Sequence, residues 1–457
     1  MPGSPSQKRR WGWYFFDWAS QPYNTLLITF IFGPYVKDLL SDGAAAQALW
    51  GYTIGATGIV IALLAPFLGA AADRGGHRIG WIVVFSALYV LGAAGVWLAR
   101  PEGGQLPLSL GLFALGIIGM EFATIFTNAM LPGLGPKHEI GRISGTGWAF
   151  GYVGGLAALV IMLLAFAESP SGTTLLGRAP AFGLDPATRE GTRFVGPFTA
   201  LWYLVFMVPF FLWVRDPGPK RRQRLAPAVK GAWNALCHTV RALPRQRSFS
   251  AFLLSSMFYR DALNGLYIFG GLYAAGVLGW GVIDTGLFGI LALVFSALFA
   301  WVGGRADRRF GPALVIRVNL VVLTAVCSAI LFVSREHVFG FAVAPASRLP
   351  DIAFYAIGAL IGGAGGALQP ASRTMVCHQA EPAAITQAFG LFALTGKATA
   401  FLAPLSIAVV TDLTGSQQLG IIPVIGLFLL GLMLFTRVKP KQERAEWAAS
   451  ETSSSQV

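Results

Sequence analysis

The chain has 457 residues, of which 55% are hydrophobic and only 12% are charged. Soluble domains carry about 25% charged residues, so this composition excludes an ordinary water-soluble globule. The three cysteines form no CxxC pair, and none lies at metal-ligand spacing from a histidine. This pattern argues against a zinc or redox-dithiol protein, and we expect no metal and no cofactor.

Long apolar runs, separated by charged or Gly/Pro-rich segments, recur along the chain. A hydrocarbon core about 30 Å thick needs roughly 20 apolar helical residues. Because lipid offers no partner to unpaired backbone groups, such runs form helices that pack into a bundle. The sequence therefore predicts an all-α integral membrane protein with twelve transmembrane helices, at approximately 11–36, 47–71, 79–99, 107–131, 143–167, 194–214, 249–278, 282–303, 312–334, 352–376, 385–410 and 418–436.

The first run follows three basic residues and in this respect resembles a signal peptide. However, Asp17, Gln21 and Asn24 interrupt its apolar stretch, and no small-residue cleavage site follows. We therefore interpret it as a retained spanning helix.

The net charge of +13 is unevenly distributed over the loops. Most Lys and Arg residues lie in the N-terminus, the even-numbered loops and the C-terminus, whereas the odd-numbered loops hold more acidic than basic residues. Basic loops stay in the cytoplasm, so both termini are expected there. Taken alone, the dense basic stretch from Arg215 to Arg247 would also suit nucleic acid or calmodulin. We interpret it as a topology-fixing loop that contacts anionic lipid headgroups, and we expect no nucleic-acid partner.

Short matching elements recur in the same order in the two halves of the chain. The matches are Tyr14-Phe15-Phe16-Asp17 with Phe258-Tyr259-Arg260-Asp261, Asp73-Arg74 with Asp307-Arg308, and Ala149-Phe150-Gly151 with Ala388-Phe389-Gly390. They predict two pseudo-symmetric six-helix bundles, residues 1–214 and 249–437, with a basic cytoplasmic linker at 215–248 and a disordered cytoplasmic tail at 438–457. Duplicated bundles are typical of secondary transporters, in which two repeats move around a site near the membrane midplane.

Two loop motifs extend this interpretation. Residues 69–78, Gly-Ala-Ala-Ala-Asp-Arg-Gly-Gly-His-Arg, fit the pattern Gly-x-x-x-Asp-Arg-x-Gly-x-Arg that follows the second helix in the major facilitator superfamily. The second copy, Gly303 to Gly311, keeps Asp307 and Arg308 but has one additional residue before Gly311. The chain thus resembles that superfamily, which implies a cytoplasmic gate, for which the candidates are Asp73, Arg74, Arg78, Asp307, Arg308 and Arg373.

Further stretches resemble one branch of this superfamily, the autophagy-related vacuolar amino-acid exporters and their bacterial relatives. They are Tyr14-Phe15-Phe16-Asp17-Trp18-Ala19-Ser20, Asn128-Ala129-Met130-Leu131-Pro132, Ser144-Gly145-Thr146-Gly147, Gly151-Tyr152-Val153-Gly154-Gly155, Gln369-Pro370-Ala371-Ser372-Arg373-Thr374 and 389–397. The resemblance covers nearly the whole spanning region and implies transport without naming the substrate.

Ionisable residues inside the spans are the main candidates for function, because a lone charge in hydrocarbon costs several kcal/mol. Asp17 either has a structural role, as a cytoplasmic latch that pairs with Arg373 or Lys397 or as a cap of a neighbouring helix, or takes part in substrate or proton binding. Asp261, at the equivalent position of the repeat, has the same alternatives and has Arg260 as a neighbour. Lys397 either binds a substrate carboxylate or forms a salt bridge with Asp17 or Asp261.

Glu121, near the middle of the fourth span, is the first candidate for proton coupling, since low-dielectric surroundings favour a carboxyl group that can hold a proton. The alternative is a permanently protonated Glu121 that forms a hydrogen bond between helices. Neutral polar and aromatic candidates that would border a cavity, or form interhelical contacts instead, are Asn24, Asn128, Asn264, Gln387 and Trp148. Glycines at four-residue spacing predict close helix contacts at Gly147, Gly151 and Gly155, and at Gly358, Gly362 and Gly366.

These observations predict a secondary active transporter of a small polar or zwitterionic solute, amino acids first, that works by alternating access with proton coupling. Alternatives are an exporter of amphipathic drugs or lipids and a transport-inactive sensor or scaffold. The chain lacks recognisable Ser/His/Asp and Cys/His constellations and the phosphate-binding GxxxxGK[ST] loop, so we expect neither an enzyme nor an ATP-driven pump. The Ala/Gly/Arg-rich composition suits a bacterial inner membrane, and we expect a monomer.

Overall fold

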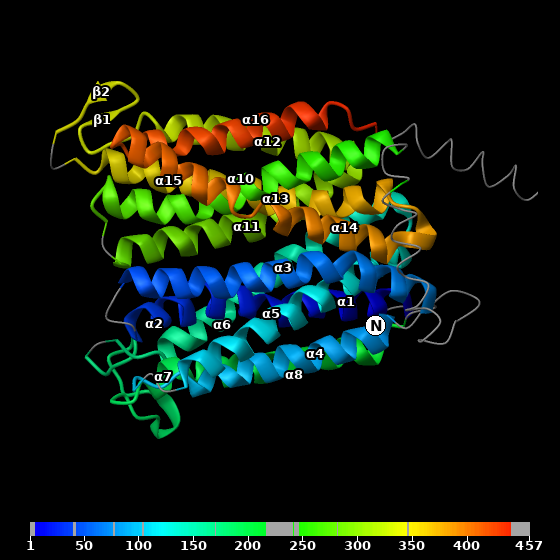
Figure 1. The fold of residues 1–457 in the computed structure, drawn as a ribbon, viewed down its shortest axis with the longest axis horizontal. Coiled ribbons are helices and arrows are strands. Elements are labelled where there is room, and N and C mark those ends of the chain that lie inside the picture. Colours follow the sequence, from blue (N-terminus) through cyan, green and yellow to red (C-terminus); the bar gives the residue numbers. More distant parts are fainter. Residues whose placement is uncertain are drawn as a thin grey trace, which may run out of the picture. The chain divides into compact units, whose positions relative to one another are not determined.

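The computed structural model describes residues 5–39, 43–75, 78–102, 105–169, 171–215, 241, 246–280, 282–344 and 347–439. Most of the expected basic linker at 215–248 and most of the expected tail at 438–457 therefore lie outside the described residues. The described chain is almost entirely helical (Figure 1), which confirms the predicted fold class.

The first half of the chain supplies six spans. Its helices are α1 (Pro5–Pro22), the π-helix η1 (Tyr23–Phe30), α2 (Phe32–Leu39), α3 (Gly43–Gly75), α4 (Arg78–Gly95), η2 (Val96–Leu98), α5 (Leu106–Asn128), η3 (Leu131–Leu134), η4 (Lys137–Glu139), α6 (Ile140–Ala165), η5 (Ala181–Gly183), α7 (Glu190–Arg193) and α8 (Val195–Trp213). The first span consists of α1 and η1, and the others are centred on α3, α4, α5, α6 and α8.

The second half supplies six more. Its elements are α10 (Arg247–Gly276), α11 (Val282–Phe310), α12 (Pro312–Ile330), β1 (His337–Val338), β2 (Phe341–Ala342), α13 (Leu349–Gln379), η6 (Pro382–Ala384), α14 (Ile385–Ala398), α15 (Leu402–Thr414), η7 (Leu419–Ile421) and α16 (Ile422–Phe435). The two strands pair antiparallel, with Val338 opposite Phe341. The eleventh span is divided into α14 and α15.

Length and composition identify the membrane-spanning helices. Among the described residues, nine helical segments are long and apolar enough to cross a membrane, and Leu419–Phe435 is a shorter apolar helix. Together with the first span and α10, these segments account for the twelve predicted spans.

The chain forms two compact units that do not follow the order of the sequence. Unit 1 contains residues 1–134 and 150–229, and unit 2 contains residues 135–149 and 230–457. The first ten residues of α6 therefore belong to unit 2, and the rest of this helix belongs to unit 1.

Aromatic side chains hold the spans of unit 1 together. Tyr23 donates a hydrogen bond of 2.6 Å to the carbonyl of Phe113 on α5. Its ring contacts that of Tyr89 on α4, which stacks on Tyr203 of α8 with centroids 3.9 Å apart. All three tyrosines are buried, so a single aromatic cluster joins four spans.

Proline in a span leaves a carbonyl without its helical partner, and unit 1 shows how such a carbonyl is satisfied. Pro22 has no N–H to donate to the carbonyl of Trp18. The indole Nε1 of Trp202, on α8, donates to that carbonyl at 3.2 Å. A neighbouring helix thus supplies the missing donor, as is required where no water is present.

Glycine allows the closest helix contact in unit 2. A Cβ atom at Gly362 of α13 would lie 2.2 Å from the carbonyl oxygen of Ala292 on α11, and one at Gly366 would lie 2.4 Å from that of Ser296. A Cβ atom at Gly358 would lie 2.1 Å from the ring of Phe288. The predicted contact face of Gly358, Gly362 and Gly366 is confirmed.

We predict that Gly362→Ala destabilises the protein by about 1–3 kcal/mol, because the new methyl group must push α11 and α13 apart. The measurement is the thermal unfolding midpoint of the purified protein in detergent. Gly426→Ala is the matched control, since a Cβ atom there, on α16, meets nothing within 4 Å. Equal midpoints for the two variants would contradict the close packing.

Candidate functional site

A polar face lies along the first span. Asp17, Gln21 and Asn24 are separated by four and three residues, so they share one side of the helix. All three are half-buried, whereas the residues around them in this stretch are mostly buried. This face therefore carries a carboxyl and two amide groups within the membrane-spanning region.

Helix α6 positions Asp17. A Cβ atom at Gly151 would lie 3.1 Å from the backbone oxygen of Asp17, and one at Gly154 would lie 2.8 Å from that of Trp18. At Gly155 the nearest atom is the hydroxyl of Thr25, at 2.5 Å. The predicted close contact at Gly151 and Gly155 is thus confirmed, and the backbone of α6 lies directly against the first span.

Asn24 lies in the π-helix η1, a form that occurs frequently at functional sites. The hydroxyl of Thr29 donates to the carbonyl of Asn24 at 2.9 Å, and the amide of Asn24 donates to the Met120 sulfur at 3.4 Å. Since Met120 precedes Glu121, the two candidate residues Asn24 and Glu121 come from adjoining parts of unit 1.

Helix α5 has a matching polar face. Glu121, Thr124 and Asn128 follow one another at helical spacing and are half-buried, while the residues between them are all buried. The first span and α5 together offer two carboxyl groups and three side-chain amides in unit 1. Such a set can bind a polar solute by hydrogen bonds, and its carboxyl groups can bind a cation or a proton.

In unit 2, Asp261 lies at the interruption of the eleventh span. Its carboxylate oxygen Oδ2 accepts a hydrogen bond of 3.1 Å from the N–H of Ala403, in the first turn of α15. Asp261 is only 1% exposed, and its oxygen Oδ1 has no hydrogen-bond partner among the described residues. A negative group at a helix N-terminus is favourable, so Asp261 caps α15 from a neighbouring helix.

Arg260 is directed to the other half of this span. Its guanidinium donates to the carbonyl of Phe392 on α14 at 2.6 Å and lies 4.1 Å from the centre of the Phe392 ring. A Cβ atom at Gly396 would lie 2.5 Å from the guanidinium. Two consecutive residues of α10 therefore contact the two parts of the eleventh span: Arg260 binds α14, and Asp261 binds α15.

The other candidates of unit 2 differ in exposure. Asn264 is exposed, Gln387 is buried, and Lys397 is half-buried in the last turn of α14. Lys397 immediately follows Gly396, where Arg260 packs. The predicted pairing of Asp17 with Lys397 or Arg373 joins residues of the two units and stays a prediction.

The first copy of the loop motif closes a turn within unit 1. Arg78, at the start of α4, forms an ion pair of 2.9 Å with Asp73, at the end of α3. The side chain of Arg74 and residues 76–77 lie outside what the structure describes.

The second copy contacts the N-terminal end of α6 and the short helix η4 before it. Arg308 forms an ion pair of 2.8 Å with Glu139, which also pairs with Arg142. A Cβ atom at Gly141 would lie 2.3 Å from the carboxyl carbon of the buried Asp307. Both Asp307 and Arg308 of the second motif therefore contact residues 139–142.

Arg373 completes the contacts of this segment. The guanidinium, on α13, donates to the hydroxyl of Ser144 at 2.9 Å and to its carbonyl at 2.7 Å. The same hydroxyl donates to the carbonyl of Pro370 at 2.9 Å. Arg373 also lies 5.7 Å from the centre of the Trp148 ring, so two predicted candidates come together.

Sequence reasoning named Ser144 only as part of a family motif and did not select Glu139, Gly141 or Ser144 as site residues. The available signal was an acidic residue just before the fifth span with an arginine three residues later, a spacing that allows a pair. Their partners on α11 and α13 could not be inferred without the fold. Among the described residues, no group of three or more His, Cys, Asp or Glu side chains is arranged to hold a metal ion.

The chain matches a known family over most of its length. The family described as "Vacuole effluxer Atg22 like" matches residues 44–448. An uncharacterized MFS-type transporter of Bacillus subtilis (strain 168), YxiO, is 24% identical over 94% of this chain and 95% of its own length. Autophagy-related protein 22 of Cryptococcus neoformans is 24% identical over 67% of this chain. The aligned region covers 52% of that fungal protein, about half of its length.

Solved structures show the same fold. The MFS transporter FucP in its outward conformation superposes with a TM-score of 0.69 and 16% identity, over 95% of this chain and 98% of its own. The proton:xylose symporter XylE has a TM-score of 0.66 and 12% identity, over 95% of both chains. The twelve-helix fold predicted from the sequence is confirmed.

We predict that Asp261→Ala destabilises α15, because it leaves the N–H of Ala403 without a partner at a cost of about 1–3 kcal/mol. Hydrogen exchange should become faster in the first turn of α15 and remain unchanged in α12. Asp261→Asn is the control, since its amide oxygen can still accept the bond. Unchanged exchange in Asp261→Ala would show that the cap does not hold this helix.

We further predict that Glu139→Lys lowers the thermal midpoint, because it places three basic groups together in unit 2. The double variant Glu139→Lys/Arg308→Glu should recover part of the loss, with a coupling of about 1 kcal/mol because Arg308 is partly exposed. Additive effects of the two changes would contradict a direct pair.

Proposed function

The chain belongs to the Atg22-like family of major facilitator secondary transporters, a family of membrane carriers and not of enzymes, and on this premise we propose that it carries a small polar or zwitterionic solute. An amino acid is the first candidate, and the coupling ion that we propose is the proton.

The polar face of unit 1 is the observation that carries this proposal. A permanent set of carboxyl and amide groups along half-buried positions of two spanning helices is costly unless it faces a cavity or binds polar partners. Asp17 and Glu121 can accept hydrogen bonds from an ammonium group, and Gln21, Asn24 and Asn128 can both donate and accept.

Lys397 is the proposed partner of a substrate carboxylate. It lies half-buried in the last turn of α14, in the half of the chain opposite to Asp17 and Glu121. A lysine ammonium group can donate up to three hydrogen bonds to such a carboxylate.

Proton coupling is proposed for Glu121, which is half-buried in the fourth span and adjoins Met120, the partner of Asn24. A carboxyl group in these surroundings can exchange a proton as its contacts change during transport.

The contacts of residues 139–148 with α11 and α13 are the proposed cytoplasmic gate. Ion pairs and hydrogen bonds from Glu139 and Ser144 would have to break and form again once per cycle. We propose a plasma-membrane location, as the similarity to a bacterial transporter suggests.

The direct experiment uses purified protein in liposomes, with labelled amino acids added in the presence and absence of an imposed pH gradient. Saturable exchange of label that is inhibited by one unlabelled amino acid supports the proposal. Transport of amphipathic cations or lipid probes in place of amino acids would favour the drug or lipid exporter, and no transport of any solute would favour a sensor.

We predict that Glu121→Gln abolishes accumulation driven by the pH gradient and leaves exchange of solute at equal pH intact, because the amide cannot carry a proton. Thr124→Val, one turn away on the same face, serves as the control for local disturbance. Unchanged gradient-driven accumulation in Glu121→Gln would remove Glu121 from the coupling role.

A further inference from the structure

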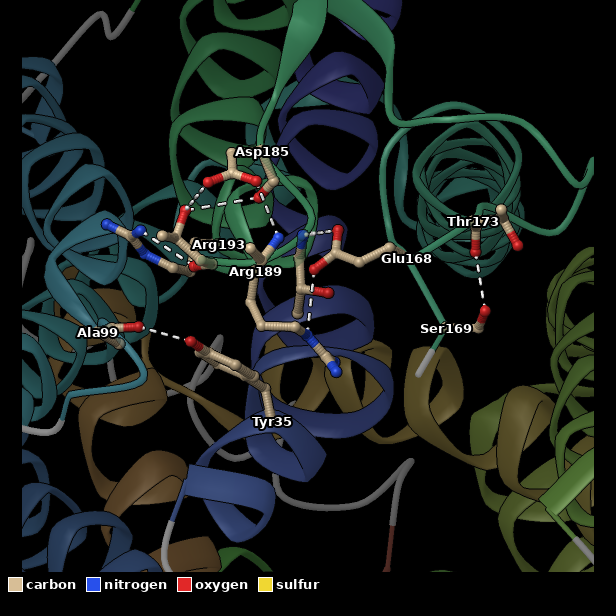
Figure 2. A network of polar contacts seen from close by, with 11 residues as sticks. Tyr35, Ala99, Glu168, Ser169, Thr173, Asp185, Arg189 and Arg193 are labelled. Atoms are coloured by element: carbon tan, nitrogen blue, oxygen red, sulfur yellow. Dashed lines mark hydrogen bonds and ion pairs between the residues drawn. The ribbon is translucent and has the colours of Figure 1, made fainter. Parts of the chain in front are cut away.

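A network of polar contacts fixes the base of the loop between α6 and α8, residues 166–193 (Figure 2). The buried Glu168 accepts a hydrogen bond of 2.9 Å from the N–H of Thr192 and lies 3.1 Å from Nε of Arg189. Arg193, also buried, donates twice to the carbonyl of Trp97, at 3.0 and 2.6 Å. These contacts join α7 to the ends of α4 and α6, so this loop, called the first loop below, is held firmly at its base.

The far part of the first loop presents apolar side chains outward. Phe182 is 85% exposed and has a φ of 62°, in the left-handed region that a bulky residue rarely adopts. Leu175 and Leu176 are also exposed, and the N–H of Leu175 donates to the carbonyl of Leu163, in the last turn of α6. The exposed Leu175 therefore lies beside the end of a spanning helix.

The loop between α12 and α13, residues 331–348, repeats this arrangement in unit 2 and is called the second loop. Arg335 fixes its base: the guanidinium donates to the carbonyl of Leu278 at 2.6 Å and pairs with Asp351 at 2.8 Å. Trp280 donates to the same carboxylate at 2.6 Å. The base thus joins α10, α12 and α13.

The tip of the second loop also carries exposed phenylalanines. Phe341 is 76% exposed, and Phe339 is 52% exposed with a φ of 52°. The N–H of Phe339 donates at 2.7 Å to the carbonyl of Phe332, an exposed residue just after α12. As in the first loop, strained backbone and exposed aromatic rings occur next to the end of a spanning helix.

Each of these features has a cost in water. A left-handed backbone conformation is unfavourable at a residue other than glycine, and an exposed Phe or Leu loses the free energy of burial. Both costs are offset if the side chains enter the apolar edge of a membrane, which accepts Phe and Leu side chains. Four spans, α8, α10, α11 and α12, separate the two loops, so the loops emerge on the same side of the membrane.

We propose that the first and second loops insert their apolar tips into the membrane interface on the side opposite to the Asp-Arg motifs, one anchor for each unit. The partner is the lipid surface, because exposed apolar side chains continue from each loop onto the adjoining spanning helix, at Val160 and Ile161 on α6 and at Ala325 and Val321 on α12. The proposal concerns a surface apart from the transport site and does not depend on the substrate.

The test measures collisions of a spin label in the full-length protein, reconstituted in phosphatidylethanolamine/phosphatidylglycerol vesicles. Phe182→Cys and Phe341→Cys are labelled in a Cys237→Ser background, since the described cysteines Cys327 and Cys377 are buried. The lipid reference is Leu201→Cys on α8, and the matched water references are Arg178→Cys and Glu336→Cys, which are exposed in the same two loops.

The ratio of collisions with oxygen to collisions with a water-soluble nickel chelate should be several-fold higher at Phe182 and Phe341 than at the water references, and close to that at Leu201. A ratio equal to that of the water references would overturn the proposal. Low collision rates with both reagents would also overturn it, because they would show that protein covers the tips. Leu176→Cys provides a second position in the first loop should Phe182→Cys fold poorly.

Discussion

The need to satisfy every polar group without water governs this protein. Hydrogen bonds within helices meet this need along most of the chain. Where a helix is interrupted or contains proline, the polar backbone groups need partners from elsewhere in the fold. Trp202 of α8 supplies the donor that Pro22 lacks, and Asp261 of α10 accepts the N–H of Ala403 where the eleventh span is interrupted. In both places a side chain from one helix completes the backbone of another, so the interruptions depend on tertiary structure.

Small residues set the second constraint, since they determine which helices can approach closely. Glycines bring α6 against the first span in unit 1, and α13 against α11 in unit 2. In unit 2, Gly141 and Gly145 likewise meet α11, at Asp307 and at Ala300 with Gly304. The ion pairs of Glu139 and the hydrogen bonds of Arg373 are short because these backbones already lie so near to each other.

Much of this was accessible from the sequence. The twelve spans and the family followed from hydropathy, charge distribution and motifs, because the membrane makes long apolar runs unambiguous. The glycine faces followed from spacing. The partners of the charged residues could not be predicted from the sequence. Arg373 donates to Ser144, which is remote in sequence, and only the fold shows that their helices lie side by side. The position of η1 and the interruption after Ala398 also escaped prediction, because neither depends on a local pattern alone.

The two halves of the chain place their irregularities in different spans. The first half has its π-helix in the first span and an unbroken α6, whereas the second half has an unbroken α10 and an interrupted eleventh span. Equivalent spans of the two halves therefore differ in their backbone form. Chimeras that exchange equivalent helices between the halves would therefore place a regular helix where an irregular one is needed, or the reverse. The two halves are not structurally interchangeable.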